Sequence, residues 1–156
     1  MKDISTVGTV ITFSGGIHLD GLVIDEFSDE GTPFDSPDVD LSDNRKNLNG
    51  EMISSRVAAV YPLSISVIPG SIADKRLFQH YKAATLHVGN VAPIGNLKIN
   101  SIVISIPDID ASGGGGASRV YKWGNIRMKN GPTGPSTSSE GRQSPRTYTF
   151  EAQDLD

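Results

Sequence analysis

The fold is decided by residues 57–84, which read VAAVYPLSISVIPGSIADKRLFQHYKAA. In the first half of this stretch every second residue is apolar: Val57, Ala59, Tyr61, Leu63, Ile65 and Val67. A period of two is typical of a strand with one buried face, so we expect a strand over 57–67. Pro62 falls on the opposite face and has no amide hydrogen, which predicts an edge position or a bulge there. Pro69 and Gly70 end this strand.

The second half of the stretch predicts a helix from Ser71 to about Ala84. Ser71 can cap its first turn, and Asp74 resembles the partner in a capping box and suits the positive end of the helix dipole. One apolar stripe is expected to pack on a sheet, made of Ala73, Leu77, Tyr81 and Ala84 with Phe78 beside it. The other face of the helix is polar and carries Lys75, Arg76, Gln79 and Lys82. We expect His80 to lie among these polar positions.

Further strands are expected on both sides of this unit. Residues 6–13 (TVGTVITF) and 22–27 (LVIDEF) predict a hairpin, and residues 146–152 (RTYTFEA) predict the last strand with Tyr148 and Phe150 inward. In the strand over 97–106 the apolar residues change parity, which predicts a β-bulge near Asn100 and Ser101. A strand over 119–128 has a bend at Gly124, with Val120, Ile126 and Met128 on one face and Trp123 on the other.

A long acidic stretch, Ser28 to Gly50, separates the first hairpin from the central strand. It shows neither a helical nor a strand period, and loops of this length inside a compact domain are usually functional or disordered. Its scattered apolar residues predict an extended arm that docks on another subunit, with contacts from Phe34, Asp35, Asp38, Val39, Asp40 and Leu41. Residues 130–145 (NGPTGPSTSSEGRQSP) predict a second, flexible loop.

These elements predict a single domain over 1–156 that is mainly β. We expect an antiparallel β-sandwich or small barrel of about six or seven strands, flanked by one α-helix and carrying long extended loops. The net charge of −4 argues against a nucleic-acid binder, which would show a basic face. The chain has no cysteine, no apolar run long enough to span a bilayer and no signal-peptide core at its N-terminus, so we expect synthesis in a cytoplasm without export.

No grouping of residues indicates an enzyme, a cofactor site or a metal site. His18, His80 and His87 are dispersed, and no G-x-S-x-G motif occurs. Asp38, Asp40 and Asp43 imitate a calcium loop but lack its glycine and its bidentate glutamate. The glycine run 113–116 precedes a strand and is interpreted as a hinge. The basic residues Arg119, Lys122, Arg127 and Lys129, interleaved with Tyr121 and Trp123, are better suited to a subunit interface than to nucleic acid.

The order of elements resembles that of bacteriophage tail tube proteins and their relatives at the tail tip. The resemblance rests on TVGTVITF and LVIDEF, the long arm, the strand and capped helix LSISVIPGSIADKRLFQHY, and the closing RTYTFEA. It implies two antiparallel sheets packed into a barrel flanked by one helix, as in type VI secretion and tailocin tubes. The long loop at 130–145 departs from the usual pattern and leaves open whether the chain builds a repeating tube or a specialised ring.

The resemblance also implies a structural role in a virion tail. Six copies would form a ring, rings would stack into a tube, and the genome would pass through the lumen without specific binding. Partners would be sister copies, the tail sheath, and baseplate or tape-measure proteins, with no membrane involved. Lys75, Arg76 and Lys82 would face the sheath.

Two alternatives remain open at this stage. One is a tube-like ring at the tail tip or baseplate. The other is a monomeric β-sandwich that binds carbohydrate on a platform of Tyr121 and Trp123. A small hydrolase using His18 or His87 would need a partner set that the sequence does not show.

Overall fold

The computed structural model describes residues 8–16, 18–27, 33–56, 59–85, 97–107, 118–137 and 141–156. These ranges contain one helix, α1 (Ile72–Ala84), and nine strands: β1 (Val10–Ser14), β2 (Val23–Ile24), β3 (Phe34–Asp35), β4 (Ser42–Lys46), β5 (Met52–Arg56), β6 (Tyr61–Val67), β7 (Ile99–Ile106), β8 (Arg119–Asn130) and β9 (Arg146–Leu155). Seven strands form one antiparallel sheet in the order β2-β1-β7-β8-β9-β6-β3, and β4 and β5 form a separate pair. The predicted mainly β fold with one flanking helix is confirmed.

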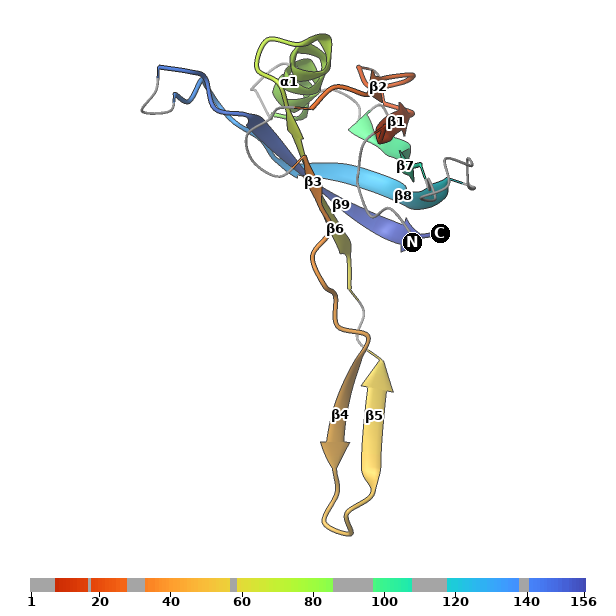
Figure 1. Ribbon diagram of the computed structural model, residues 1–156. Helices are drawn as coiled ribbons and strands as arrows, with labels where there is room; N and C mark the ends of the chain where they lie inside the picture. The colour runs from red at the N-terminus through yellow and green to blue at the C-terminus, as the bar shows by residue number, and fades with distance from the viewer. Residues whose placement is uncertain are drawn as a thin grey trace, which may run out of the picture.

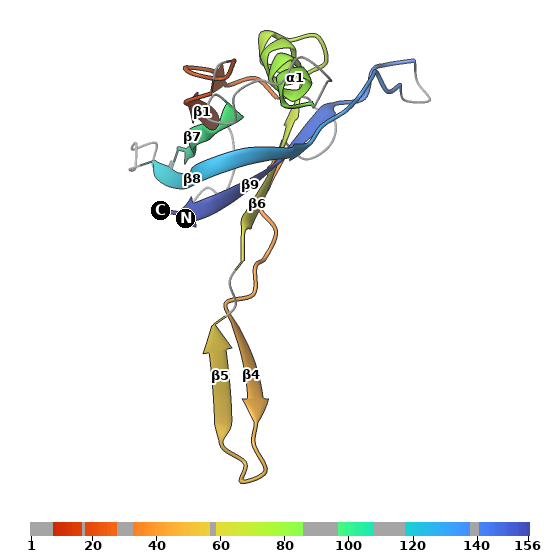
Figure 2. The ribbon, with the colours of Figure 1, turned by 180° about the vertical axis from the view of Figure 1, so that it is seen from behind.

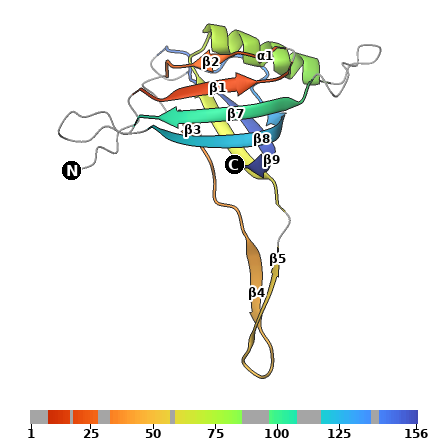
Figure 3. The ribbon, with the colours of Figure 1, turned by 90° about the vertical axis from the view of Figure 1, so that its right-hand side faces the viewer.

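The seven-stranded sheet curves so that its two halves face each other across the core. Phe13 of β1 and Phe150 of β9 are separated by two strands in the sheet, yet their ring centroids lie 5.8 Å apart. Side chains from both halves fill one buried cluster, which includes Ile11, Leu63, Ile104 and Tyr148. Figure 3 shows α1 lying along the side of β1 and β2, and Leu77 inserts from the helix into this cluster.

The helix begins and ends close to where the sequence predicts. Ser71 is the N-cap, and its side chain accepts from the backbone N–H of Asp74. His80 is 1% exposed, so its placement on the polar face was wrong. The helix turns this residue toward the turn at Gly16, where a Cβ would lie at ordinary contact distance from the His80 ring, 3.9 Å. No helix in the described part of the chain is long and apolar enough to cross a membrane.

The predicted bulge near Asn100 and Ser101 is not a shift of register. Ile99 pairs with Ile126 and Ile102 with Trp123, so the pairing of β7 with β8 continues unbroken. In both strands the alternation of buried and exposed residues shifts by one position here, between Ile99 and Ile102 in β7 and between Trp123 and Ile126 in β8. Asn125, in the middle of the shift in β8, has a φ of 51°. Because the two strands bend together, Trp123 is buried on the same side as Ile126, contrary to the predicted opposite faces.

The remaining strands follow the predicted order with different bounds. β1 and β2 form the expected hairpin, and β9 extends to Leu155 with Tyr148 and Phe150 buried. β6 begins at Tyr61, not at 57, and residues 57–58 lie outside the described ranges. The glycine run 113–116, Asp108 and Asp110 and His87 also lie outside them.

The acidic arm is not a strandless loop. Phe34 and Asp35 form β3 against β6, and residues 42–56 form the β4–β5 hairpin, in which Ser42 pairs with Arg56 and Lys46 with Met52. Figures 1 and 2 show this hairpin projecting away from the body of the molecule. The strand period was missed because each face of the hairpin mixes polar and apolar residues, so no alternation marks it.

The second predicted loop extends the β8–β9 pair. Thr137 bridges to Gln143, and the N–H of Ser144 donates to the carbonyl of Ser136 at 2.7 Å. The side chain of Arg146 donates from Nη1 to the carbonyl of Gly134 at 3.2 Å. The described parts of this loop therefore form a second, shorter projection, on the same end of the sheet as α1 in Figure 1.

Candidate subunit interface

The turn of the β4–β5 hairpin is built by Asn47 and Gly50. The Asn47 side chain accepts from the backbone N–H groups of Asn49 and Glu51 at 3.0 and 2.9 Å. Gly50 has a φ of +82°, a conformation that costs other residues strain, and its N–H donates to the carbonyl of Asn47. The N–H of Asn47 also donates to the carbonyl of Glu51 at 2.9 Å, so residues 48–50 form a three-residue connection. A connection of this length with a left-handed glycine is one of the common hairpin types. The segment Asn47-Leu48-Asn49-Gly50 is the signal from which the hairpin could have been predicted.

The hairpin has no hydrophobic core of its own. Every residue of β4 and β5 is exposed, on both faces of the ribbon. Large apolar side chains lie open along it and beside it, with Leu48 106%, Leu41 79% and Met52 71% exposed. A two-stranded ribbon of this kind is marginally stable in water by itself. Its length and its exposed apolar residues are typical of a segment that binds a partner.

An apolar groove lies where the hairpin joins the body. It has a volume of about 340 Å³ and lies between the segment 36–41 and the ends of β6, β8 and β9. Its apolar lining comes from Val39, Leu41, Tyr61, Tyr121, Trp123 and Leu155. Asp38 lines it as well, and Asp35 and Asp40 are exposed in the same segment.

The structure separates the six predicted arm residues into two groups. Phe34 and Asp35 lie in β3, and Phe34 packs against the core of its own chain. Asp38, Val39 and Leu41 line the groove at the base of the hairpin, and Asp40 lies beside them. Whether any of the six contacts another subunit stays a prediction.

The predicted sheath-facing residues differ in their environment. Lys75 and Lys82 are exposed, and the Lys82 ammonium lies 4.9 Å from the centre of the Phe78 ring. Arg76 is half-buried and donates to the backbone carbonyls of His18 and Asp20 at 2.9 and 2.7 Å. Arg76 therefore fastens the helix to the turn between β1 and β2.

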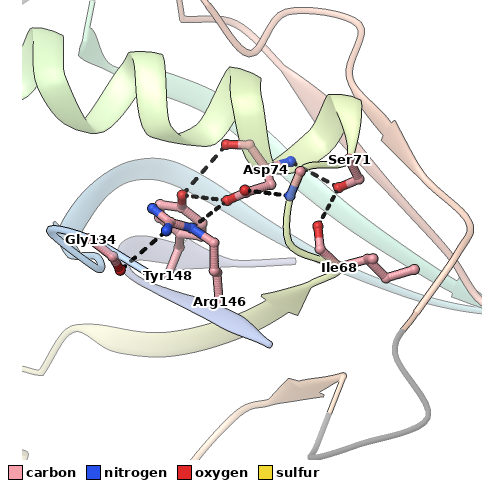
Figure 4. A network of polar contacts seen from close by, with 7 residues as sticks. Ile68, Ser71, Asp74, Gly134, Arg146 and Tyr148 are labelled. Carbon is pink, nitrogen blue, oxygen red and sulfur yellow. Dashed lines mark hydrogen bonds and ion pairs between the residues drawn. The ribbon is translucent and has the colours of Figure 1, made fainter. Parts of the chain in front are cut away.

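A buried polar network anchors the start of the helix to β9 (Figure 4). Asp74 Oδ1 lies 2.7 Å from Arg146 Nε as an ion pair and not an aligned hydrogen bond. The Tyr148 hydroxyl donates to the same oxygen at 2.9 Å, and the N–H of Gly70 donates to Oδ2 at 2.9 Å. In a complete capping box the carboxylate of Asp74 would accept from the backbone N–H of the N-cap residue. Here it accepts from the N–H of Gly70 instead.

The network holds fixed protonation states. Burial, reinforced by the Asp74 carboxylate, raises the pKa of Tyr148 to about 12, so the hydroxyl remains a donor at neutral pH. Burial lowers the pKa of the Arg146 guanidinium. The interactions with Tyr148 and Asp74 have the larger combined effect, and they raise this pKa above its ordinary value. Gly131 allows the loop to approach, because a Cβ there would lie 2.8 Å from the Tyr148 ring.

The basic and aromatic residues of β8 do not form one surface, as their mixed parity in the sequence indicates. Trp123 is 6% exposed and has turned into the core, while Tyr121 is 45% exposed. Lys122 pairs with Asp156 at 3.7 Å and Lys129 with Glu151 at 3.2 Å. A ring this deeply buried cannot stack on a sugar, so the platform of the carbohydrate-binding alternative is lost.

The fold resembles two solved components of contractile injection systems. One is the PVC sheath/tube terminator of an extracellular contractile injection system in its extended state, with 15% identity, a TM-score of 0.60, and coverage of 99% of this chain and 95% of that chain. The other is the anti-feeding prophage cap (AFP tube terminating cap), with 15% identity, a TM-score of 0.54, and coverage of 100% and 91%. At this identity the likeness establishes the fold.

A family model described as tail fiber protein gp32 matches residues 2–156. The chain therefore belongs to the tail fiber protein gp32 family, and it is a structural protein related to phage tails. No curated protein matches it. The predicted link with phage tails is confirmed at this level, but the matching family is a tail fiber family and not specifically a tail tube family.

Proposed function

We propose that this chain assembles with copies of itself into a ring coaxial with a phage-type tail tube, and that the β4–β5 hairpin joins neighbouring subunits. The observation that carries the proposal is the hairpin itself, which projects from the body and exposes apolar residues on a ribbon without a core. The family and the fold of the two tube terminators support a place in a tail.

A ring at the end of the tube is favoured over a repeating tube subunit. The two similar structures are a sheath/tube terminator and a tube terminating cap, and both are covered almost completely by the alignment. A terminal ring needs one face that continues the tube and one that ends it. The prediction of six copies, and of a genome passing through the lumen, belongs to the same proposal.

Electron microscopy of the purified, concentrated protein tests this function. Closed rings of one size that do not extend into filaments are the expected result. Long tubes would instead favour the repeating tube subunit. A field of single compact particles at every concentration would contradict ring assembly itself.

Contact with a sheath is the second part of the proposal. Lys75 and Lys82 offer the exposed positive charges for it, whereas Arg76 is engaged within the chain. Reversing both charges (Lys75→Glu with Lys82→Glu) should weaken co-purification with the sheath protein of the same tail. Unchanged co-purification would remove this face of the helix from the proposal.

A further inference from the structure

Within the described residues, the groove at the base of the hairpin is an open apolar site that no other segment of the chain fills. Tyr121 and Leu155 form part of its wall and remain about half exposed, at 45% and 54%. Apolar side chains gathered beside a cavity of about 340 Å³ favour an occupant that covers them.

The hairpin of the same chain does not fill the groove with its tip. The groove lies at the root of the hairpin, while Leu48 lies in the turn between β4 and β5. Figures 1 and 2 show this turn at the end of the hairpin that is farthest from the body. The five-residue strands β4 and β5, paired along their full length, separate the two. If a hairpin tip fills this groove, it must therefore be the tip of a second molecule.

The tip and the groove are complementary in polarity. Leu48 is fully exposed, and Met52 lies on the same face of the ribbon as Lys46, with which it pairs. The aromatic and aliphatic walls of the groove can receive Leu48 and Met52. Asp38, which also lines the groove, can pair with the ammonium of Lys46.

The two charges are also free to meet. Within the described parts of the chain neither Lys46 nor Asp38 makes an ion pair, whereas the neighbouring Arg45 is held by Asp43 at 3.2 Å. Glu51 at the turn offsets the charge of Lys46, so the tip has no net charge and the attraction is between Lys46 itself and this edge of the groove, to which Asp35 and Asp40 add negative charge.

We propose that the groove receives the hairpin tip of a second copy of this chain, with Leu48 against the aromatic wall and Lys46 beside Asp38. This contact rests on the proposed function and specifies its interface. Each subunit then gives one tip and receives another, a head-to-tail contact that closes into a ring when the rotation between copies allows it.

The natural absence of cysteine makes a direct test clean. Two single variants, Leu48→Cys and Leu155→Cys, are mixed at a concentration that gives assemblies and treated with a short bis-maleimide. The expected product is a covalent dimer containing one copy of each variant. The matched control replaces Leu155→Cys by Gln79→Cys, an exposed helix position outside the groove, and should give little of this product.

The outcomes separate the contact from the function. Assemblies that cross-link through 48 and 155 no better than through 48 and 79 would overturn this contact and leave ring assembly standing. An absence of assembly by wild-type protein would overturn both. A linkage found only within one chain, in the double variant Leu48→Cys with Leu155→Cys, would also contradict the contact between copies.

A charge exchange provides an independent readout. Lys46→Glu and Asp38→Lys should each raise the midpoint concentration of assembly, by about three- to five-fold for an exposed pair. Combining the two substitutions should restore the midpoint toward wild type. Additive weakening in the double variant would show that the two residues do not meet.

Discussion

Asp74 is a buried carboxylate whose charge is matched from three directions. The Arg146 guanidinium, the Tyr148 hydroxyl and the N–H of Gly70 all approach its two oxygens (Figure 4). The side chains of Arg146 and Asp74 are only 12% and 10% exposed, so water can replace little of what each charge gains from the other. Removing one member leaves the other charge buried and unpaired, which is costly.

We therefore expect Asp74→Asn to lower the free energy of unfolding by about 3 kcal/mol. The amide keeps the shape of the side chain but leaves Arg146 without its counter-ion. Urea unfolding followed by circular dichroism measures the change. Asp43→Asn is the control, because it breaks the exposed pair with Arg45 and should cost less than about 0.5 kcal/mol. Equal effects of the two substitutions would contradict the role given to the network.

His80 predicts a dependence of stability on pH. Burial, with a smaller contribution from His18, lowers its pKa from 6.5 to about 4, and its Nδ1 has no hydrogen-bond partner among the described residues. Between these values the unfolded chain binds a proton that the folded chain does not, so stability rises with pH. The stabilisation is complete above about pH 6.5 and is lost as pH falls toward 4, by up to roughly 3 kcal/mol.

Thermal unfolding between pH 4 and 7.5 tests this dependence. His80→Leu removes the titrating group and should flatten the profile in this window, while His18→Gln should leave most of it in place. A profile that is equally steep in His80→Leu would assign the acid sensitivity to other groups.

At the scale of the element, the hairpin is the part of the molecule that depends most on a partner. Its ten strand residues make one ladder and bury no side chain. We expect its amides to exchange with deuterium rapidly in dilute monomer and to become protected on assembly, because a docked partner removes the opening motions. Amides of β9 serve as the internal control and should be protected in both states. Hairpin amides that exchange equally fast in assembled protein would show that the ribbon makes no contact.

The elements differ in how far the sequence could predict them. The helix and β6 were predicted because their apolar residues keep one period and because Ser71 caps the helix. The hairpin was missed because a ribbon exposed on both faces carries no alternation, and only its Asn-Leu-Asn-Gly turn marks it. The position of Trp123 was wrong because two paired strands bend together at Asn125, and a single strand's pattern cannot show that.

The site residues were harder to predict than the elements. Asp38, Val39 and Leu41 were singled out from their composition, and the fold places all three in the groove. The groove's other wall comes from Tyr61, Tyr121 and Leu155, which lie far apart in the sequence. They come together because β8, β9 and β6 are neighbours in the sheet. Phe34 was expected at an interface, but its ladder with β6 also packs it on its own core.

At the scale of the whole molecule, the described part of the seven-stranded sheet is bordered by two short strands. Its two edge strands, β2 and β3, have two residues each, and short edges of this kind discourage pairing between molecules. The β4–β5 ribbon is longer and lies away from the body (Figure 1). Assembly of this protein is therefore expected to depend on the hairpin more than on the edges of the seven-stranded sheet.

Sedimentation velocity of wild type and of a variant with residues 42–56 replaced by a short Gly-Ser linker tests that dependence directly. The account predicts a discrete multiple of 16.6 kDa for wild type at high concentration, and a monomer for the variant. The variant should keep the thermal midpoint of the body, because β4 and β5 share no ladder with the main sheet. A variant that assembles as well as wild type, or a wild type that stays at 16.6 kDa throughout, would contradict the central claim.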